Sequence, residues 1–409
     1  MAQHYDIGIR GDGIVGCTLA LLLASQRLKV ALIGAPASAA PAPTGTEHSD
    51  IRAYSLNAAS RALLQSLRAW PQPEWTTPVR EMRVCGDGDR DDGGGEVIFS
   101  ADNLPPPEDG QPPALNWIVQ AQALQARLHE AVRFQPLIDR LPLAAQTPPT
   151  TPPVSATLLV ACEGQASASR AEWGVAWHVQ AYAQRAIATR VVCELPHGQV
   201  ARQWFDGGDI LAFLPLNSPA DTAPGQASDH AQGNLVAVVW SVSVTRATEL
   251  LAASDADFCQ ALQQASRNAL GSLRQSAPRA AWPLQRAKAQ HWVGQQGGQS
   301  WALAGDAAHT VHPLAGLGLN LGLADAAGLA QVLGQRAYWR GVGDLKLLRR
   351  YERARQWELM GVAGATDGLQ QLFAQPGEFW RAVRNHGLRG FNHSGPLKAW
   401  LVRKASGQI

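Results

Sequence analysis

The chain has 409 residues, and its 35 lysines and arginines nearly balance its 33 aspartates and glutamates, leaving a formal net charge of +2. This near-balance argues against strong electrostatic recruitment to nucleic acid. At roughly 150 residues per domain, the length predicts about two or three folding units. A hydrophobic content of 46% can bury substantial cores, which excludes disorder of the whole chain.

The first predicted elements form the beginning of a βαβ unit. Tyr5 to Ile9 reads as a short strand, Gly13 to Arg27 as a helix and Lys29 to Ile33 as a second strand. Ala156 to Ala161 is a mostly apolar run of the kind that is buried in a parallel sheet. These patterns favour a parallel sheet with helical crossovers.

The middle of the chain has a different pattern, in which strands are joined by turns or loops. Four runs are predicted as strands of an antiparallel sheet: Gly174 to Ala181, Ala186 to Cys193, Ile210 to Leu216 and Leu235 to Val242. After one more short buried strand, Trp301 to Ala304, the sequence becomes largely helical. The predicted helical segments are Leu319 to Leu333, Asp344 to Ala374 and a C-terminal stretch to Ile409.

The cysteines and the apolar runs bear on location. The five cysteines are far apart and odd in number, with no Cys-x-x-Cys spacing, which argues against a disulfide framework or a metal site and is typical of a reducing cytoplasm. The apolar run from Ile14 to Ala24 is too short for a membrane span, and Asp12 precedes it without a positively charged region. We therefore expect a cytoplasmic protein.

A glycine-rich turn lies between the first strand and the first helix. Gly11, Gly13 and Gly16 have the G-x-G-x-x-G spacing. The first glycine permits the tight turn, the second lets a pyrophosphate approach the backbone, and the third lets helix and strand pack closely. In this position the motif predicts dinucleotide binding. The acidic residue that usually ends the second strand and binds the ribose is absent, because Gly34 stands there, and Glu47 and Asp50 are candidates to replace it.

A second glycine-rich element follows the late buried strand. Gly305 and Asp306 come directly after the strand, and Gly316 and Gly318 precede the predicted helix. An aspartate at a strand end can accept a hydrogen bond from a ligand hydroxyl, and the two glycines let a helix N-terminus approach a ligand closely. The alternative is a glycine-rich turn with a helix cap, but two such elements in one chain favour ligand binding.

Together these motifs resemble those of the single-component flavin monooxygenases of the para-hydroxybenzoate hydroxylase type. The resemblance rests on the N-terminal G-x-G-x-x-G, on Gly305-Asp306 and on the run from Pro313 through Asn320 to Asp325-Ala326. Within that superfamily the chain is most similar to the hydroxylases of ubiquinone biosynthesis. That similarity rests on Arg52-Ala53-Tyr54-Ser55-Leu56, Leu63-Leu64, Trp70, Tyr182-x-Gln184, Phe213-Leu214-Pro215-Leu216 and Pro396-Leu397-Lys398.

The resemblance implies an α/β fold with a Rossmann-like FAD-binding domain, an antiparallel-sheet substrate domain and a helical C-terminus. We expect the FAD-binding domain to be discontinuous, comprising residues 1–80, 114–172 and 291–343. The substrate domain would comprise residues 81–113 and 173–290, and the C-terminal helical region residues 344–409.

The resemblance also implies roles for individual residues. Gly11, Gly13 and Gly16 would hold the FAD pyrophosphate, and Arg52 and Gln120 would contact the cofactor from outside the first βαβ unit. Asp306, beside Gly305, would bind the ribityl chain, and Pro313 would face the site of oxygen chemistry. Backbone amides beside the flavin ring would stabilise negative charge and would come from Gly316, Leu317, Gly318, Leu319 and Asn320. No catalytic side chain is assigned, and for His309 and His312 a packing or helix-flanking role is as good an expectation as a catalytic one.

The chain departs from the family pattern where FAD should lie. Arg10 replaces an apolar strand end, Asp12 places a carboxylate in the phosphate loop, and Gly34 replaces the ribose-binding acid. The usual Asp-Gly in the middle of the chain appears as Glu163-Gly164 with Arg170 following, and Leu317 stands where relatives often carry Gln. Losing the ribose partner would weaken FAD binding by roughly tenfold or more. Arg10 is the candidate to offset the charge of Asp12.

The chemistry implied by the resemblance is hydroxylation of a polyprenylated phenol with O2, using FAD and NADH or NADPH. A polyprenyl tail needs an apolar channel, for which the antiparallel sheet is the expected wall. Partners would include other ubiquinone-biosynthesis proteins, with peripheral contact at the inner face of the membrane. Two alternatives stay open: a degenerate flavoprotein that serves as a structural subunit of a quinone-synthesis complex, and a hydroxylase of a small soluble phenol.

Overall fold

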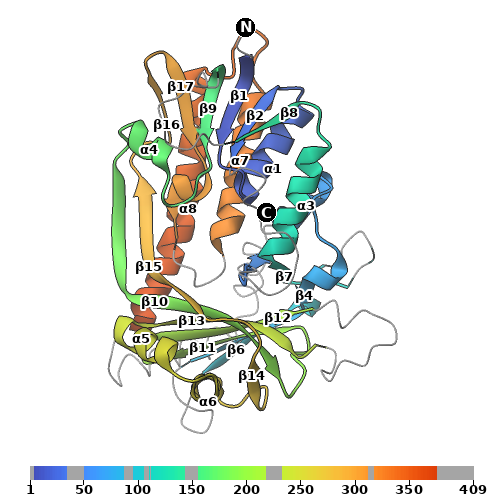
Figure 1. Ribbon diagram of the computed structural model, residues 1–409, viewed down its shortest axis with the longest axis vertical. Coiled ribbons are helices and arrows are strands. Elements are labelled where there is room, and N and C mark those ends of the chain that lie inside the picture. Colours follow the sequence, from blue (N-terminus) through green and yellow to red (C-terminus); the bar gives the residue numbers. More distant parts are fainter. Residues whose placement is uncertain are drawn as a thin grey trace.

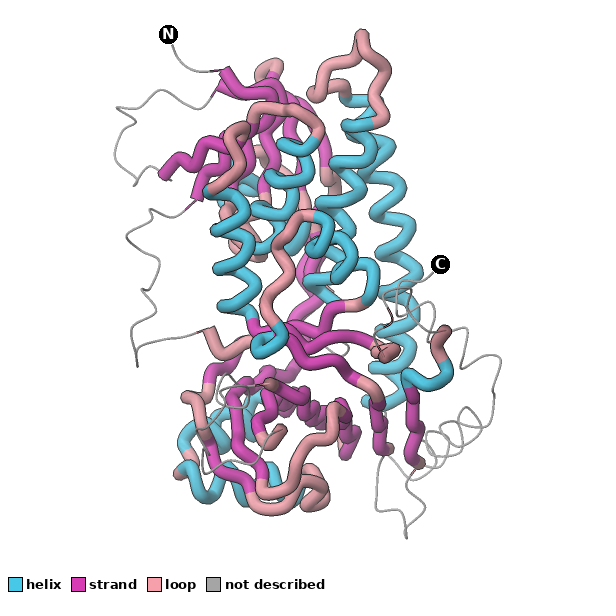
Figure 2. The backbone as a smooth tube through the Cα atoms, turned by 90° about the vertical axis from the view of Figure 1, so that its right-hand side faces the viewer, coloured by secondary structure: helices cyan, strands magenta, loops and turns pink. Residues whose placement is uncertain are grey.

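The computed structural model describes residues 4–34, 50–86, 95–105, 110, 112–142, 155–217, 233–311 and 317–374. Two large sheets lie at opposite ends of the molecule (Figure 1). The upper sheet is covered by long helices, and Figure 2 shows these helices extending along the molecule towards the lower sheet. The fold therefore places two separately built sheets around a shared middle region.

The upper sheet has six strands in the order β16-β17-β9-β1-β2-β8. β1 pairs in parallel with β2 and β9, β8 pairs in parallel with β2, and β17 pairs in parallel with β9, whereas β16 is antiparallel to β17. The strands are β1 (His4–Arg10), β2 (Val30–Gly34), β8 (Ile138–Pro142), β9 (Ser155–Ala161), β16 (Val293–Gln296) and β17 (Gln299–Leu303). The predicted βαβ beginning is present.

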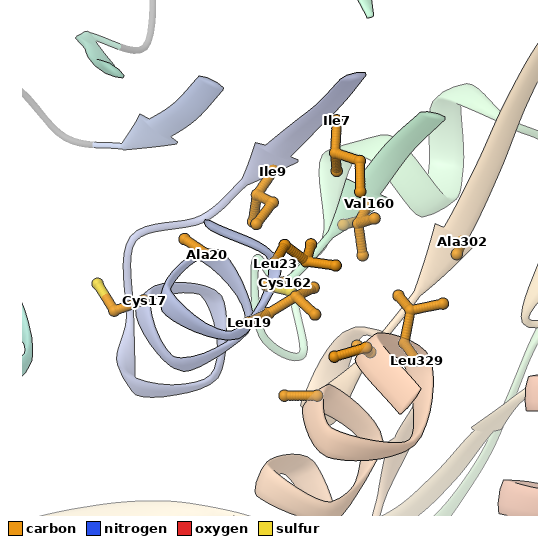
Figure 3. Close-up of a cluster of buried hydrophobic side chains, with 14 of the residues drawn as sticks. Ile7, Ile9, Cys17, Leu19, Ala20, Leu23, Val160, Cys162, Ala302 and Leu329 are labelled. Carbon is orange, nitrogen blue, oxygen red and sulfur yellow. The ribbon is translucent and has the colours of Figure 1, made fainter. Parts of the chain in front are cut away.

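Helices pack on this sheet: α1 (Ile14–Ser25), α3 (Ala121–Arg133), α7 (Leu317–Gly334) and α8 (Leu345–Ala374). α1 is apolar around its whole circumference and is buried between the sheet and its helical neighbours, as expected for a helix with no polar face. α3 is amphipathic and buries Leu124, Leu128 and Val132. In Figure 3, side chains of β1, α1, β9, β17 and α7 converge in the core, among them Ile9, Leu23, Val160, Ala302 and Leu329.

The lower sheet has nine strands. Eight lie in the order β18-β15-β10-β13-β12-β11-β5-β6, and the ninth, β14, also pairs with β10. Its pairs are antiparallel except for β5 and β11, which are parallel, so the predicted antiparallel sheet is in fact mixed. The strands are β5 (Glu81–Cys85), β6 (Glu96–Ser100), β10 (Trp177–Cys193), β11 (Val200–Asp206), β12 (Asp209–Leu216), β13 (Leu235–Ser243), β14 (Leu273–Gln275), β15 (Ala280–Ala289) and β18 (His309–Thr310).

One prediction within this sheet is wrong. Gly174 to Ala181 and Ala186 to Cys193 were expected as separate strands, but β10 is continuous and spans 17 residues. Both halves pair with β15, and a register shift between Ala181 and Arg185 marks a bulge. The polar residues that suggest a turn in the sequence therefore form a bulge that bends one long strand.

Two helices cover the outer face of the lower sheet, and the sequence analysis did not predict them. These are α5 (Val244–Ala252) and α6 (Asp255–Ala265). Ser243 and Ser254 cap their N-termini, each accepting a hydrogen bond from a backbone amide three residues ahead. Trp240 of the sheet and Phe258 of α6 belong to the buried core between these layers. The opposite face of the sheet turns towards the upper sheet.

A small antiparallel sheet connects the two large ones. It consists of β3 (Ala53–Leu56), β7 (Asn116–Gln120) and β4 (Thr76–Val79) in the order β3-β7-β4. β3 contacts α7, and both β4 and β7 contact β12, so this sheet touches both halves. The remaining elements are α2 (Ala58–Ser66), α4 (Ala168–Glu172) and short 3-10 turns at Pro73–Trp75, Ala101–Asn103 and Gly305–Ala307.

Strands of the upper sheet come from residues 4–34, 138–161 and 293–303, and strands of the lower sheet from residues 81–100, 177–289 and 309–310. α8 packs against α7 and β16 of the upper half. The domain boundaries given above stay a prediction. Within the described ranges, none of the helices is long and apolar enough to cross a membrane.

Candidate functional site

A cavity of about 1380 Å³ lies between the two large sheets. Its upper wall is formed by loops at the carboxyl ends of β1, β9 and β17, with the start of α7, and its lower wall by the inner face of the nine-stranded sheet. β1 lies between β2 and β9: the chain runs from β1 to β2 and later β8 on one side, and then places β9 and β17 on the other. Such a switch point at the carboxyl ends of parallel strands is where α/β folds bind ligands.

The glycine-rich turn at this point has the geometry of a phosphate site. Gly11 has φ +108°, and a Cβ at this residue would lie 2.4 Å from the carbonyl oxygen of Cys162. A Cβ on Gly16 would lie 1.9 Å from the carbonyl oxygen of Gly11, so only glycine permits this close packing of helix and strand. By contrast, a Cβ on Gly13 would meet nothing within 4 Å, which leaves room for a ligand beside the backbone.

The N-terminus of α1 points its backbone amides at the same space. In the described part of the chain, no side chain caps this helix and its first turn contains no acidic residue. Its first amides have no partner within the helix, and the helix dipole places partial positive charge there. Gly11, Gly13, Ile14 and Val15 line the cavity, so an anionic group can reach these amides.

The peptide of Asp12 is held by three donors. Its carbonyl oxygen accepts hydrogen bonds from Cys17 Sγ at 3.1 Å, Gln125 Nε2 at 2.9 Å and His129 Nε2 at 3.0 Å. Burial, reinforced by the charge of Asp12, raises the pKa of the Cys17 thiol to about 12, so this thiol stays protonated as a donor. Gln125 and His129 were not predicted as site residues; their i, i+4 spacing on α3 is the signal that places them on one face of the helix.

Arg10 does not offset the charge of Asp12, contrary to the expectation from the sequence. Its guanidinium bonds Glu172 at 2.5 Å and Ser169 at 3.0 Å, and it lies over the ring of Trp173. Arg140 of β8 instead pairs with the Asp12 carboxylate, at 3.1 Å from Nη2 to Oδ2. The sequence could not show this pairing, because β8 lies more than 100 residues away.

Arg52 lies on the cavity wall, where the sequence placed a cofactor contact. It forms a two-pronged ion pair with Asp50, with Nε–Oδ1 at 2.8 Å and Nη2–Oδ2 at 2.6 Å. Burial tends to raise the pKa of the Asp50 carboxyl, but the hydrogen bonds and charge of Arg52 outweigh burial and hold this pKa below its ordinary value. The pair therefore stays charged and fixes Arg52 at the rim.

The second glycine-rich element brings Asp306 to the cavity. Gly305 has φ +63°, and its amide donates to Oδ2 of Asp325 at 2.9 Å. The pKa of the Asp306 carboxyl is raised, chiefly because surrounding protein removes it from bulk water, while the charges of His309 and Arg52 oppose the rise. The loop thus presents an acceptor to the cavity from a backbone that Asp325 holds from behind.

Asp325 is the centre of a buried polar network. It is fully buried and also accepts hydrogen bonds from His309 Nε2 at 2.6 Å and Arg355 Nε at 2.8 Å. The His309 ring stacks on Trp292, with centroids 4.9 Å apart. This arrangement agrees with the packing role expected for His309, and His312 lies outside the described residues.

Glu163 and Arg170 organise the loop after β9. Glu163 accepts hydrogen bonds from the Ser167 hydroxyl at 2.6 Å and the Ser169 amide at 3.0 Å. Arg170 is buried over the ring of Trp177 and donates to the carbonyl of Ala307 at 3.0 Å. Glu163 and Gly164 line the cavity, so this loop forms part of the upper wall and is tied to the Asp306 turn.

The remaining predicted site residues divide into three groups. Gly318 and Leu319, at the start of α7, line the cavity. Asn320 points elsewhere, because its side chain bonds the backbone of Ser55. Gln120 also points away from the described lining: its amide donates to the carbonyl of Asn217 at 3.0 Å. Pro313, Gly316 and the Leu317 side chain lie outside what the structure describes.

The lower wall of the cavity is mainly apolar and includes several small side chains. Five alanines on five different strands line it: Ala188, Ala201, Ala212, Ala237 and Ala280. Larger apolar residues, including Ile210 and Leu214, lie among them, and Ser241, Gln203 and Arg279 add polar groups. A wall of this kind leaves space for an apolar ligand beside the polar upper wall. Among the described residues, no cluster of His, Cys, Asp and Glu has the arrangement of a metal site.

Comparisons with known proteins agree with this geometry. Residues 144–363 match the family described as FAD binding domain. The chain is 29% identical to 3-demethoxyubiquinol 3-hydroxylase of Escherichia coli, over 99% of each chain. It is 27% identical to ubiquinone hydroxylase UbiL of Rhodospirillum rubrum, over 99% of this chain and 90% of that protein.

A solved structure supports the fold. PqsL of Pseudomonas aeruginosa in complex with 2-aminobenzoylacetate superimposes with a TM-score of 0.72 at 19% identity, covering 95% of this chain and 100% of that one. The family match covers more than half of the chain and includes the Glu163 loop, the Asp306 turn and the start of α7. The chain therefore belongs to the family described as FAD binding domain, and its fold is that of PqsL.

Proposed function

We propose that this enzyme hydroxylates the aromatic ring of a polyprenylated phenol in ubiquinone biosynthesis, using O2 and NADH or NADPH. The observation that carries the proposal is one cavity that runs from the glycine-rich turn to the alanine-lined sheet. The two relatives described above, named 3-demethoxyubiquinol 3-hydroxylase and ubiquinone hydroxylase UbiL, support the substrate class. A single cavity allows a cofactor on the polar wall and an apolar substrate on the other to meet.

The residues on the polar wall suit FAD. Gly11 and Gly16 permit close packing that a Cβ would prevent, and the open space beside Gly13 suits a pyrophosphate. Asp306 would accept a hydrogen bond from the ribityl chain, and Arg52 would contact the cofactor from its position just before β3. Whether Gln120 also contacts FAD stays a prediction, which its bond to Asn217 does not favour.

Bound FAD supplies the redox chemistry that activates O2. The chain's own contribution is to bind, orient and exclude water. The first backbone amides of α7, at Gly318 and Leu319, would stabilise negative charge at the flavin's pyrimidine end. Pro313 and Gly316 would complete this edge. The apolar lower wall, with Ala212 and Leu214, would hold the substrate away from bulk water, which limits side reactions with water.

The first experiment is the absorption spectrum of the purified protein with added FAD, followed by NADH or NADPH without oxygen. We expect a flavin spectrum that bleaches with reductant. Failure to bind FAD would overturn the proposal and favour a structural subunit of a quinone-synthesis complex. Comparing NADH with NADPH at equal concentration identifies the reductant.

The second experiment compares phenols that carry tails of different length, with oxygen insertion measured by mass spectrometry. Each buried CH2 contributes ~0.8 kcal/mol, so one added isoprene unit is expected to raise kcat/KM by about tenfold or more. Equal kcat/KM for tailed and tail-free phenols would contradict the lipid substrate and favour a small soluble phenol.

A lipid substrate also implies contact with a membrane surface, which we propose to be peripheral and at the cytoplasmic face. Trp357 and Met360, on neighbouring turns of α8, are 75% and 55% exposed and provide an apolar surface for such contact or for other ubiquinone-biosynthesis proteins. Flotation with phospholipid vesicles tests the membrane contact. We expect Trp357→Ala to reduce the floated fraction, and an unchanged fraction would exclude this surface.

A further inference from the structure

The two departures from the usual glycine-rich motif, Asp12 and Gly34, meet at one place in the structure. A Cβ placed on Gly34 would lie 2.0 Å from Cγ of Asp12 and 2.3 Å from its Oδ2. The Asp12 carboxylate therefore occupies the space in which any side chain at position 34 would begin. Residue 34 cannot carry a side chain while Asp12 keeps this position.

That space is where dinucleotide-binding folds usually carry their ribose acid. In such folds an Asp or Glu at the end of the second strand hydrogen-bonds the ribose 2′-hydroxyl. Gly34 is the last residue of β2, which is that second strand. A carboxylate is thus present at the expected end of the strand, although it is supplied by the glycine-rich turn.

The contacts of Asp12 hold its carboxylate there. Its carbonyl oxygen is fixed by Cys17, Gln125 and His129, which determines the path of the turn. Arg140 bonds Oδ2 at 3.1 Å, and no described residue donates to Oδ1. The Asp12 side chain is 21% exposed and lines the cavity. One carboxylate oxygen is therefore held by protein, and the other can accept from a ligand.

Arg140 also resolves the electrostatic objection to a carboxylate in this turn. A lone carboxylate beside a pyrophosphate would repel it. The guanidinium pairs with Asp12, so the pair together carries no net charge, while the α1 amides beside Gly13 remain directed at the phosphate site. The acid can serve the ribose without opposing the phosphates.

We infer that Asp12 accepts a hydrogen bond from the 2′-hydroxyl of the FAD adenosine ribose, in place of the acid that β2 lacks. This inference rests on FAD binding. It reverses the expectation from the sequence, in which Gly34 removes the ribose partner and Asp12 disturbs the phosphate site. Asp12 and Gly34 instead act together: the carboxylate has moved from the end of β2 to the glycine-rich turn and still lies at the ribose.

The test measures dissociation constants by flavin fluorescence for full-length protein stripped of flavin. The ligands are FAD and its 2′-deoxyadenosine analogue. We expect wild type to bind FAD about tenfold more tightly than the analogue, because the analogue cannot donate to a carboxylate. Asp12→Ala should bind both equally, and Asp12→Asn should show an intermediate ratio because a neutral acceptor remains.

The ratio within each variant separates a ribose contact from a general change in the turn, since distortion weakens both ligands alike. Glu130→Gln is the matched control: this carboxylate on α3 pairs with Arg127 outside the cavity lining, and the variant should keep the wild-type ratio. Wild type that binds both ligands equally tightly would overturn the inference while FAD binding stands. Wild type that binds neither would overturn FAD binding itself. A tenfold ratio retained by Asp12→Ala would also overturn the inference.

A second test moves the acid back to β2. Gly34→Glu alone should weaken FAD binding about tenfold or more, because its Cβ would collide with the Asp12 carboxylate. Combined with Asp12→Gly, the same substitution should regain preference for FAD over the analogue, since the space is then empty. A double variant that folds, as judged by its thermal melting, and shows no preference would overturn the exchange.

Discussion

The cavity wall below the six-stranded sheet carries polar groups on loops that hydrogen bonds hold in place, whereas the wall formed by the nine-stranded sheet carries mainly apolar side chains, five of them alanines. Asp12 is fixed through its carbonyl by three donors, and Gly305 is fixed from behind by the buried Asp325. Across the cavity, Ala188 and Ala212 present methyl groups between larger apolar side chains such as Ile210. We therefore expect the first wall to depend on the positions of its polar groups, and the second on the space that its small side chains leave free.

This contrast predicts the largest effect at Asp325. Asp325→Ala removes the buried charge partner of the Arg355 guanidinium, which keeps only its pair with the exposed Glu358, and the Gly305 amide loses its acceptor. Removing one member of a buried ion pair typically costs ~3–5 kcal/mol of unfolding free energy. We expect this loss in urea unfolding, together with weaker FAD binding because the Asp306 turn is no longer held.

Glu130→Gln is the surface comparison for that prediction. It removes an exposed ion pair with Arg127 on α3, and it should change the unfolding free energy by less than ~1 kcal/mol. Equal effects of the two substitutions would mean that the Asp325 network does not hold the polar wall.

Low pH should also lower the free energy of unfolding, because it protonates Asp325. Burial alone would raise the pKa of the Asp325 carboxyl, but the charges and hydrogen bonds of His309 and Arg355 outweigh it and hold the pKa below its ordinary value. The folded pKa is thus below the unfolded value of ~3.9, so this carboxylate stabilises the fold above about pH 3.9. The contribution disappears as the pH falls through the folded pKa.

Urea unfolding at a series of pH values checks this sign. Below about pH 4, wild type should lose stability with falling pH more steeply than Asp325→Asn, which has no proton to gain at this position. Parallel curves for the two proteins would show that other carboxylates govern the acid response.

The apolar wall should respond to added bulk in catalysis. Ala212→Phe fills part of the cavity on β12. The added ring should crowd the substrate and raise the activation barrier by ~1–3 kcal/mol, which lowers kcat/KM by about 10- to 100-fold. The dissociation constant of FAD should stay within about twofold of wild type. A matching loss of FAD affinity would show that the two walls are not independent.

The elements of the polar wall could be predicted from the sequence, but the contacts between them could not. The glycine-rich turn, Asp306 and the two strands beside them follow from local patterns, because tight turns and buried strands leave strong signals in neighbouring residues. The partner of Asp12 does not: Arg140 reaches it only because β8 pairs with β2 in a parallel register. Contacts made by strand order, over more than 100 residues, have no local signal.

The sequence predicted an antiparallel sheet as the wall of an apolar channel, but not which residues line it. The strands are recognisable one by one, but which residues face the cavity depends on register, and the parallel pairing of β5 with β11 is not visible in either segment. Gln120 and Gln125 illustrate the same limit on a smaller scale. Both belong to the β7–α3 segment, yet only Gln125 is among the described lining residues, because the helix turns it towards Asp12.

A smaller effect is expected where the polar wall meets the start of α7. Asn320 accepts from the Asn57 amide at 3.0 Å and the Ser60 hydroxyl at 2.7 Å, and donates to the Ser55 carbonyl at 2.7 Å. Asn320→Ala should lower the unfolding free energy by ~1–3 kcal/mol, because buried backbone groups lose partners. In a double-mutant cycle with Ser60→Ala, a coupling near zero would contradict the role of this bond.

The smallest effect concerns Arg52 and decides how far the polar wall extends. Its side chain is 54% exposed and pairs with Asp50, so Arg52→Lys should change the unfolding free energy by less than ~1 kcal/mol. Lys cannot form the two-pronged pair. If Arg52 contacts FAD as proposed, the dissociation constant should rise by up to about tenfold in a titration by flavin fluorescence, and Asp50→Asn, which keeps the guanidinium, should raise it less. An unchanged constant in Arg52→Lys would restrict this arginine to its pair with Asp50, so that the cofactor wall would end at the Asp306 turn.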